Sequence, residues 1–127
     1  MHNLLKLTRR PDITFYPSGR ILITARIANI LNITPGDSIN IAIIDGESLL
    51  HVIPKGLGRR RAVCFPSKKG GRSLCCNSVA LCQQIFNISK VSPQKTSFLA
   101  GDILSLNGKP FIPIITGFPI ISPPPLK

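Results

Sequence analysis

Runs of β-branched residues, interrupted by turn-forming residues, predict short strands at the beginning of this chain. Asp12–Tyr16 and Arg20–Thr24 are two such runs, and Pro17-Ser18-Gly19 separates them. β-Branched and aromatic residues bounded by Pro, Gly and Ser are typical of strands that a turn connects. We therefore expect an antiparallel pair of strands here.

The hydrophobic period then changes to that of a helix. Ile27, Ile30 and Leu31 are spaced i, i+3 and i+4, which places them on one face of a two-turn helix. Pro35-Gly36 ends the segment, because Pro fixes φ for a turn and Gly tolerates the positive φ that follows. Asp37 is placed to accept hydrogen bonds from nearby backbone N–H groups.

A hairpin is predicted after this turn. The segments SINIAII (38–44) and SLLHVI (48–53) flank Asp45-Gly46. Asp-Gly between two apolar runs is a strong signal of a type I′ turn. The first half thus predicts two strands, a short helix and a hairpin.

The second half repeats these landmarks less regularly. Ala62–Phe65 resembles a strand, Val79, Cys82 and Phe86 have helical spacing behind Ser78 as N-cap, and PFIPII (110–115) closes a last hairpin. The matching marks are Phe15-Tyr16-Pro17-Ser18 with Phe65-Pro66-Ser67, Gly19-Arg20 with Gly71-Arg72, Asn32-Ile33 with Asn87-Ile88, Gly36-Asp37 with Gly101-Asp102, and Asp45-Gly46 with Asn107-Gly108.

These marks divide the chain into two degenerate copies of one unit, residues 1–57 and residues 58–127. Gly-Arg and Gly-Asp are 17 residues apart in the first copy and 30 apart in the second, so we place an insertion near residues 89–99. We expect the tail ISPPPLK (121–127) to be extended and polyproline-like rather than core. Each copy is too small to bury its apolar faces alone, so we expect both to form one barrel about a pseudo-twofold axis.

Charge is the strongest signal in the composition. Sixteen Lys and Arg face five Asp and Glu, which gives a net charge of +11. Residues 1–57 carry six bases and four acids, whereas residues 58–127 carry ten bases and one acid. A field of this sign attracts polyanions, chiefly nucleic acid and less often an anionic membrane or an acidic protein. The alternative is a solvated basic surface that serves solubility.

A basic cluster lies between the two copies and at the beginning of the second. Its members are Lys55, Arg59, Arg60, Arg61, Lys68, Lys69 and Arg72. Lys and Arg neutralise phosphates and release counterions, so such a cluster binds nucleic acid without reading its sequence. A flexible solvated linker is the alternative interpretation.

The remaining chemistry does not favour an enzyme. The two histidines are His2 and His51, the five acids lie mostly at turns, and no catalytic triad, phosphate loop or carboxylate pair is evident. The cysteines are Cys64, Cys75, Cys76 and Cys82, without a C-x-x-C motif, and we interpret them as small buried hydrophobes rather than zinc ligands. We expect no cofactor and no metal.

The first half of the chain resembles the AbrB/MazE-like (SpoVT-AbrB) swapped-hairpin family. The residues that carry the resemblance are Gly19-Arg20-Ile21-Leu22-Ile23, the helix ending at Leu31, and Asn32-Ile33-Thr34-Pro35-Gly36-Asp37 with the hairpin that follows. The resemblance covers residues 12–53 well and 62–115 loosely. It implies a mainly β fold, an interleaved swapped-hairpin β-barrel with short helices, formed here by two degenerate copies in one chain. Thr24 replaces the family's Pro, and Ala28 and Asn29 replace its basic helix residues.

The resemblance also implies a function. It indicates a DNA-binding transcriptional regulator whose arginine after glycine faces DNA, which corresponds to Arg20 and Arg72. Alternatives are an antitoxin-like protein that binds a partner toxin, or a structural or assembly protein of a mobile element. The expected partner is double-stranded DNA, without a membrane, and the protein is expected to be a cytoplasmic pseudo-dimeric monomer or homodimer. The candidate DNA-binding residues are Arg20, Arg26, Arg59, Arg60, Arg61, Lys68, Lys69 and Arg72.

Overall fold

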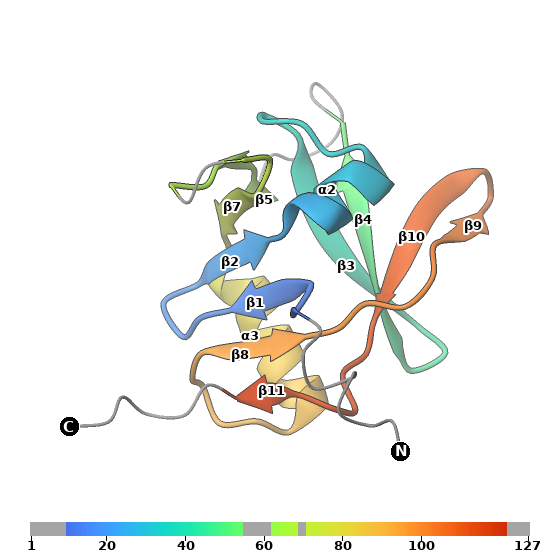
Figure 1. Cartoon of the computed structure of the whole chain (residues 1–127). Coiled ribbons are helices and arrows are strands. Elements are labelled where there is room, and N and C mark those ends of the chain that lie inside the picture. The colour runs from blue at the N-terminus through green and yellow to red at the C-terminus, as the bar shows by residue number, and fades with distance from the viewer. Residues whose placement is uncertain (1–9, 55–61, 69–70, 122–127) are drawn as a thin grey trace, which may run out of the picture.

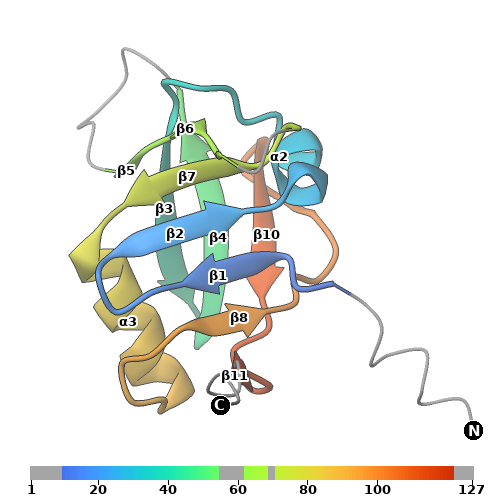
Figure 2. The same cartoon turned by 60° about the vertical axis from the view of Figure 1, so that its left-hand side comes forward.

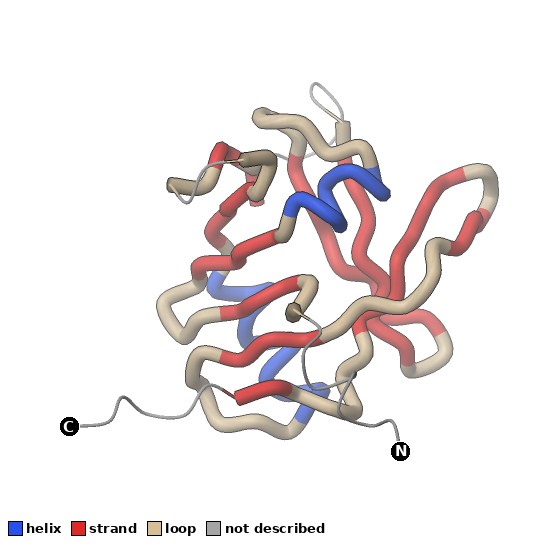
Figure 3. The backbone as a smooth tube through the Cα atoms, viewed as in Figure 1, coloured by secondary structure: helices blue, strands red, loops and turns tan. Residues whose placement is uncertain are grey.

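The computed structural model describes residues 10–54, 62–68 and 71–121 of the chain. This part of the protein is mainly β, as the sequence predicts, with two helices among many short strands (Figure 3). The elements, in chain order, are β1 (Ile13–Phe15), β2 (Arg20–Ile23), α2 (Ala25–Leu31), β3 (Ser38–Ile44), β4 (Glu47–Ile53), β5 (Ala62–Val63), β6 (Phe65–Pro66), β7 (Leu74–Asn77), α3 (Val79–Ser89), β8 (Thr96–Phe98), β9 (Leu104–Leu106), β10 (Lys109–Ile114) and β11 (Ile120–Ile121).

Helix α2 has the predicted bounds but a different buried face. Ile27, Ala28 and Leu31 are buried, whereas Ile30 is 37% exposed. The helix ends at Asn32, which adopts the left-handed conformation, and the Ile33 N–H then donates to the Ala28 carbonyl over 2.8 Å. The prediction that Ile30 lies on the core face of this helix was therefore wrong. A helix of two turns presents only a narrow face to the core, and Ala28 rather than Ile30 lies on that face.

Helix α3 begins as predicted, with Ser78 as its N-cap. The Ser78 hydroxyl oxygen accepts the Leu81 N–H over 3.1 Å. The predicted apolar face is only partly right: Cys82 and Phe86 are buried together with Leu81 and Ile85, but Val79 is 53% exposed. Val79 lies in the first turn of the helix, against the Gly19 turn rather than in the core.

Two antiparallel sheets contain all the described strands. The six-stranded sheet has the order β11-β8-β1-β2-β7-β6, and the five-stranded sheet has the order β5-β3-β4-β10-β9. Their strands cross steeply, with β1, β2 and β8 running across β3, β4 and β10 (Figure 2). Helices α2 and α3 lie at separate ends of this arrangement (Figure 1).

The closed barrel expected from the sequence is not found among the described residues. Both sheets end in edge strands of two or three residues, β5 and β9 in one and β6 and β11 in the other. The chain passes from one sheet to the other at Cys64, between β5 and β6, without a continuous ladder. Strands this short provide too few backbone groups to extend the hydrogen bonding around a corner.

Four strand pairings join the first half of the chain to the second, two in each sheet. In the six-stranded sheet β1 pairs with β8 and β2 pairs with β7, so that Leu22 lies opposite Cys75. In the five-stranded sheet β3 pairs with β5 and β4 pairs with β10, so that Leu50 lies opposite Ile112. Each sheet is therefore built from strands of both halves.

A single hydrophobic core fills the space between the sheets. It contains residues of both halves, among them Ile21, Ile39, Leu74 and Ile112. Phe15 and Phe98 meet edge to face with their ring centroids 5.8 Å apart. The Ser48 hydroxyl is buried without a hydrogen-bond partner in the described structure, and nothing in the fold explains it.

The predicted insertion near 89–99 contains regular structure. It includes the end of α3 and strand β8, which pairs with both β1 and β11. Strand β11 begins at Ile120, so Ile121 belongs to a sheet edge rather than to an extended tail, and residues 122–127 lie outside the described residues.

The two Gly-Asp pairs matched in sequence occupy different places. Asp37 is buried, precedes Asp45 by eight residues, and accepts both the Thr34 N–H and the Thr34 hydroxyl over 2.9 Å. Asp102 is exposed and precedes Asn107 by five residues. The predicted role of Asp37 in its turn is confirmed, and Asp102 has no matching geometry.

Candidate nucleic-acid interface

Arg20 lies on the outer face of the six-stranded sheet. It begins β2, where the residues alternate between the core, as in Ile21 and Ile23, and the outer face. One guanidinium nitrogen, Nη2, is 3.6 Å from the Cys75 sulfur, and the guanidinium carbon is 5.4 Å from the centroid of the Tyr16 ring. The hydrogen bond to Cys75 raises the pKa of Arg20 above its ordinary value. Arginine is protonated at physiological pH even without such a shift, so this side chain is a cation.

Lys95 adds a second cation at the same ring. Its Nζ is 5.8 Å from the Tyr16 centroid. An aromatic face attracts cations through its quadrupole, and it also provides a surface on which a nucleic-acid base can stack. Neither Tyr16 nor Lys95 was predicted from the sequence as part of the site. Lys95 was overlooked because it falls within the predicted insertion.

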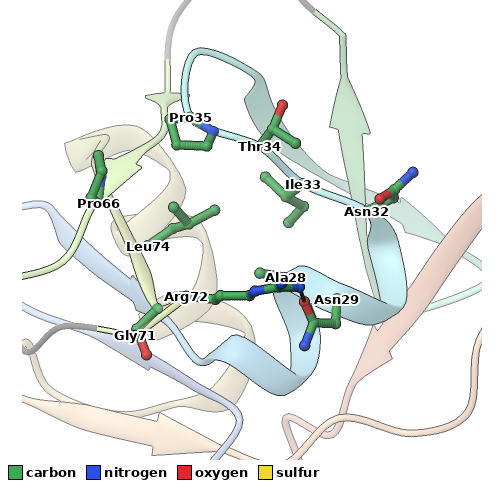
Figure 4. Close-up of a pocket in the computed structure, with 11 residues that line it drawn as sticks. Ala28, Asn29, Asn32, Ile33, Thr34, Pro35, Pro66, Gly71, Arg72 and Leu74 are labelled. Carbon is green, nitrogen blue, oxygen red and sulfur yellow. Dashed lines mark hydrogen bonds between the residues drawn. The ribbon is translucent and has the colours of Figure 1, made fainter.

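Arg72 lies in the turn between β6 and β7 and points toward α2. Its Nη1 donates to the Asn29 side-chain oxygen over 3.4 Å, and the two side chains meet at the edge of a pocket (Figure 4). This pocket has a volume of about 320 Å³. Its lining combines apolar residues with amides and Arg72: Ala28, Asn29, Asn32, Ile33, Thr34, Pro35, Pro66, Gly71, Arg72, Ser73 and Leu74.

Arg20 and Arg72 lie at opposite ends of the β2–β7 pair. Arg20 is opposite Asn77 and Ile23 is opposite Leu74, so Arg72 lies beyond the Ile23 end. Five residues separate Arg72 from Asn77, and Arg72 itself lies in the turn before β7. The backbone positions of the two arginines are therefore at most roughly 17 Å apart, at about 3.3 Å per extended residue. The structure thus holds the two cations at opposite ends of one strand pair.

Arg26 forms an ion pair with a buried carboxylate of the protein itself. Its Nη1 is 2.9 Å from Oδ1 of Asp12, and the side chains of Arg26 and Asp12 are 49% and 3% exposed. The second carboxylate oxygen of Asp12 accepts the Ala100 N–H over 2.7 Å. Arg26 therefore offsets a buried charge, and less of its positive charge is available to a ligand than at Arg72.

The other candidate residues divide into described and undescribed positions. Lys68 is exposed, directly after the edge strand β6. Arg59, Arg60, Arg61 and Lys69 lie outside the described residues.

The described acids do not offset this positive surface. Asp12 and Asp37 are buried and accept hydrogen bonds from the protein itself. The exposed acids are Asp45 and Glu47, at the β3–β4 turn, and Asp102, before β9. All three belong to the hairpin segments, where Lys109 is also exposed, rather than to the six-stranded sheet.

In the described part of the chain, the histidine and the cysteines lie in the interior or half-buried, and none forms a metal-binding cluster. His51 is half-buried against Phe111, with the ring centroids 4.8 Å apart. Burial lowers the pKa of His51, and the charge of Lys109 lowers it further. All four cysteines are buried thiols, as predicted, and no group of three or more His, Cys, Asp or Glu side chains could hold a metal ion within the described ranges.

Comparisons with known proteins identify no relative of this chain. No protein-family model, curated protein or solved structure matches this chain. Within residues 10–54, 62–68 and 71–121, no helix is both long and apolar enough to cross a membrane.

Proposed function

We propose that this protein binds double-stranded DNA along the β2–β7 pair of its six-stranded sheet, as a regulator of the AbrB/MazE-like type. The observation that carries the proposal is the placement of Arg20 and Arg72 at opposite ends of the β2–β7 pair. Two arginine positions at most roughly 17 Å apart match the scale of a B-DNA major groove about 12 Å wide, so we expect each arginine to reach the backbone on one side of the groove. Lys95 adds a cation beside Arg20 at the Tyr16 ring, and Lys68 adds an exposed cation in the segment between β6 and β7, which also carries Arg72.

Two degenerate copies interleaved in one chain would account for this placement. The pairings of Leu22 with Cys75 and of Leu50 with Ile112 put a strand of each half next to a strand of the other, which supports this interpretation. Such an arrangement gives one chain the approximate twofold symmetry that a DNA-binding homodimer has. The Gly-Arg turns of the two halves then flank the axis.

The role of the arginines is phosphate neutralisation rather than base reading. Both side chains are anchored at their guanidinium groups, Arg20 by Cys75 and Tyr16 and Arg72 by Asn29. Contacts to phosphate set position and affinity but carry no sequence information. We therefore expect binding to depend strongly on salt and weakly on sequence.

The test is a salt titration of DNA binding by the protein with Arg20→Ala and Arg72→Ala together. The slope of log affinity against log salt is expected to fall by about two units, at ~0.9 for each phosphate that is no longer neutralised. The matched control is Lys109→Ala, which removes an exposed charge from the hairpin of the five-stranded sheet. Wild-type affinity and slope in a folded double variant would exclude this surface.

A protein partner is the second candidate, and one observation favours it. The segment around β11 exposes large apolar side chains: Ile115 is 38% exposed, Phe118 78%, Ile120 39% and Ile121 45%. An antitoxin-like protein or an assembly protein would use such a patch to bind its partner. Copurification of a small partner that Phe118→Ser releases, combined with no DNA retention at low salt, would favour this function over the first.

A further inference from the structure

Cys64 occupies the corner at which the chain leaves the five-stranded sheet. Its N–H donates to the Asp37 carbonyl and its carbonyl accepts the Gly36 N–H, each over 2.8 Å. The N–H and the carbonyl of Cys64 are therefore both hydrogen-bonded to the segment that precedes β3. Neither group is hydrogen-bonded to β7, which lies on the other side of Cys64.

The strand register places Cys64 directly across from Cys76. Phe65 lies opposite Cys75 and Pro66 opposite Leu74, so one step back along β6 brings Cys64 opposite Cys76. Because the backbone of Cys64 bonds elsewhere, this is a non-hydrogen-bonded position, where facing Cα atoms are about 4.5 Å apart. Disulfides join residues whose Cα atoms are about 4.4–6.8 Å apart.

The two facing cysteines are both buried, and their thiols influence one another. Cys64 and Cys76 are 2% and 0% exposed, and a hydrogen bond between their side chains is the largest cause of the pKa shift of each. The Cys64 thiol also donates to the Ala62 carbonyl, 4.0 Å away. Cys75 accepts from Arg20 on the outer face, and the Cys82 thiol lies 3.6 Å from the Arg20 carbonyl. The bond from Cys76 lowers the pKa of Cys64, while that bond and burial raise the pKa of Cys76, so Cys64 ionises first.

We propose that Cys64 and Cys76 are the sites of a reversible disulfide that hydrogen peroxide forms. The Cys64 thiolate attacks one peroxide oxygen, the O–O bond breaks, and the hydroxide released takes up a proton to become water. The resulting sulfenic acid of Cys64 is attacked by the Cys76 sulfur, which gives up its proton. The S–S bond forms as the sulfenic oxygen leaves as water. Two thiols are oxidised by two electrons in total, and one peroxide is reduced to two waters.

Peroxide reaches the pair through local opening of the sheet edge. Strands β5 and β6 have two residues each, and β6 is the last strand of its sheet. Such short edge segments open at a lower free energy than the core. The disulfide would covalently join the two ends of the segment from Cys64 to Cys76, which contains Lys68 and Arg72. This thiol chemistry does not depend on whether the protein binds DNA.

The experiment is peroxide treatment of the folded full-length protein, alkylation of the remaining thiols, trypsin digestion and mass spectrometry. The peptide Ala62–Lys68 contains Cys64 as its only cysteine, and Ser73–Lys90 contains the other three. The expected product is these two peptides joined with the loss of two hydrogen atoms, with Cys75 and Cys82 alkylated, and separated again by dithiothreitol. Fragmentation on both sides of Cys76, between it and Cys75 and between it and Cys82, assigns the partner in the wild-type protein.

Single variants make the assignment independent of fragmentation. The link is expected to persist in Cys75→Ala and Cys82→Ala and to vanish in Cys76→Ala. A link from Cys64 to another cysteine, a disulfide between two molecules, overoxidised Cys64 without a link, or four unmodified thiols would each overturn the proposal. If Cys76→Ala does not fold, the wild-type fragmentation still decides between these outcomes.

Discussion

Asp12 connects three parts of the chain through one buried carboxylate. Its two oxygens accept from the Arg26 guanidinium and the Ala100 N–H, and its carbonyl accepts the Thr24 hydroxyl over 3.0 Å. The side chain thus holds the beginning of β1 against α2 and the segment after β8. A removed partner would leave a buried donor without an acceptor, which costs more than the hydrogen bond contributes.

We therefore predict that Asp12→Ala lowers the free energy of unfolding by about 1–3 kcal/mol. Arg26→Ala is expected to cost less, because Arg26 is half exposed and water can solvate part of the site. The measurement is urea unfolding followed by circular dichroism, with Asp102→Ala as the exposed acidic control. Equal unfolding midpoints for Asp12→Ala and Asp102→Ala would contradict this assignment.

The lowered pKa of His51 leads to a second prediction at the residue scale. Its folded pKa lies below 6.5, first because the ring is partly buried and then because of Lys109. The unfolded chain therefore binds a proton at a higher pH than the folded chain does. The stability that this histidine contributes is complete above pH 6.5 and is lost as the pH falls from there through the folded pKa.

Proton NMR of the His51 ring measures this pKa directly, and His51→Gln assigns the signal. The titration midpoint is expected below 6.5 in the folded protein and closer to 6.5 in Lys109→Ala, which removes the smaller cause. A midpoint at or above 6.5 in the wild-type protein would show that burial does not govern this histidine.

At the scale of elements, the two Gly-Arg turns differ in their surroundings. Gly19 has φ +103°, and a Cβ there would lie 2.8 Å from Cγ2 and 3.1 Å from the backbone nitrogen of Val79. The Ser78 N–H also donates to the Gly19 carbonyl over 2.8 Å, so α3 begins directly against this turn. Gly71 has φ +66° and nothing within 4 Å of the same position.

The matched variants Gly19→Ala and Gly71→Ala separate these effects. Gly71→Ala is expected to cost about 1–2 kcal/mol, the strain of a left-handed alanine. Gly19→Ala adds a collision with the α3 backbone and is expected to cost roughly 2–5 kcal/mol. Thermal unfolding of both proteins provides the comparison. A cost at Gly71 equal to that at Gly19 would mean that the α3 contact does not matter.

Local patterns predicted most elements of the fold. The bounds of α2 and of β3 agree with the sequence prediction, and Asp45-Gly46 forms the expected turn with φ of 52° and 80°. Strands β8 and β11 were missed because they are two or three residues long and pair only with distant segments. The contacts of Arg26 and Tyr16 were also missed, since no spacing in the sequence indicates that Asp12 and Lys95 lie beside them.

At the scale of the whole molecule, the stability of each half depends on the other. In each sheet two pairings join a strand of one half to a strand of the other, and one core contains residues of both halves. The first half alone would expose both edges of its β1–β2 and β3–β4 pairs, and the second half would lose the strands against which its own strands pair. Neither half then buries enough apolar surface to offset its conformational entropy.

We predict that residues 1–57 and residues 58–127, produced separately, are each unfolded and that a mixture of the two recovers the native circular dichroism spectrum. The recovered complex should unfold in one transition that shifts with concentration, because it is bimolecular. The intact chain is the control. A cooperative unfolding transition for either fragment alone would show two independent domains.

The same pairings determine when folding can finish during synthesis. Leu22 pairs with Cys75, 53 residues later in the chain, and Leu50 pairs with Ile112, 62 residues later. A ribosome adds about 5–20 residues per second, so β2 and β4 spend seconds outside the exit tunnel before their partners emerge. During that interval β2 and β4 can pair with β1 and β3, but their other edges stay open, and open strand edges are where one nascent chain can associate with another.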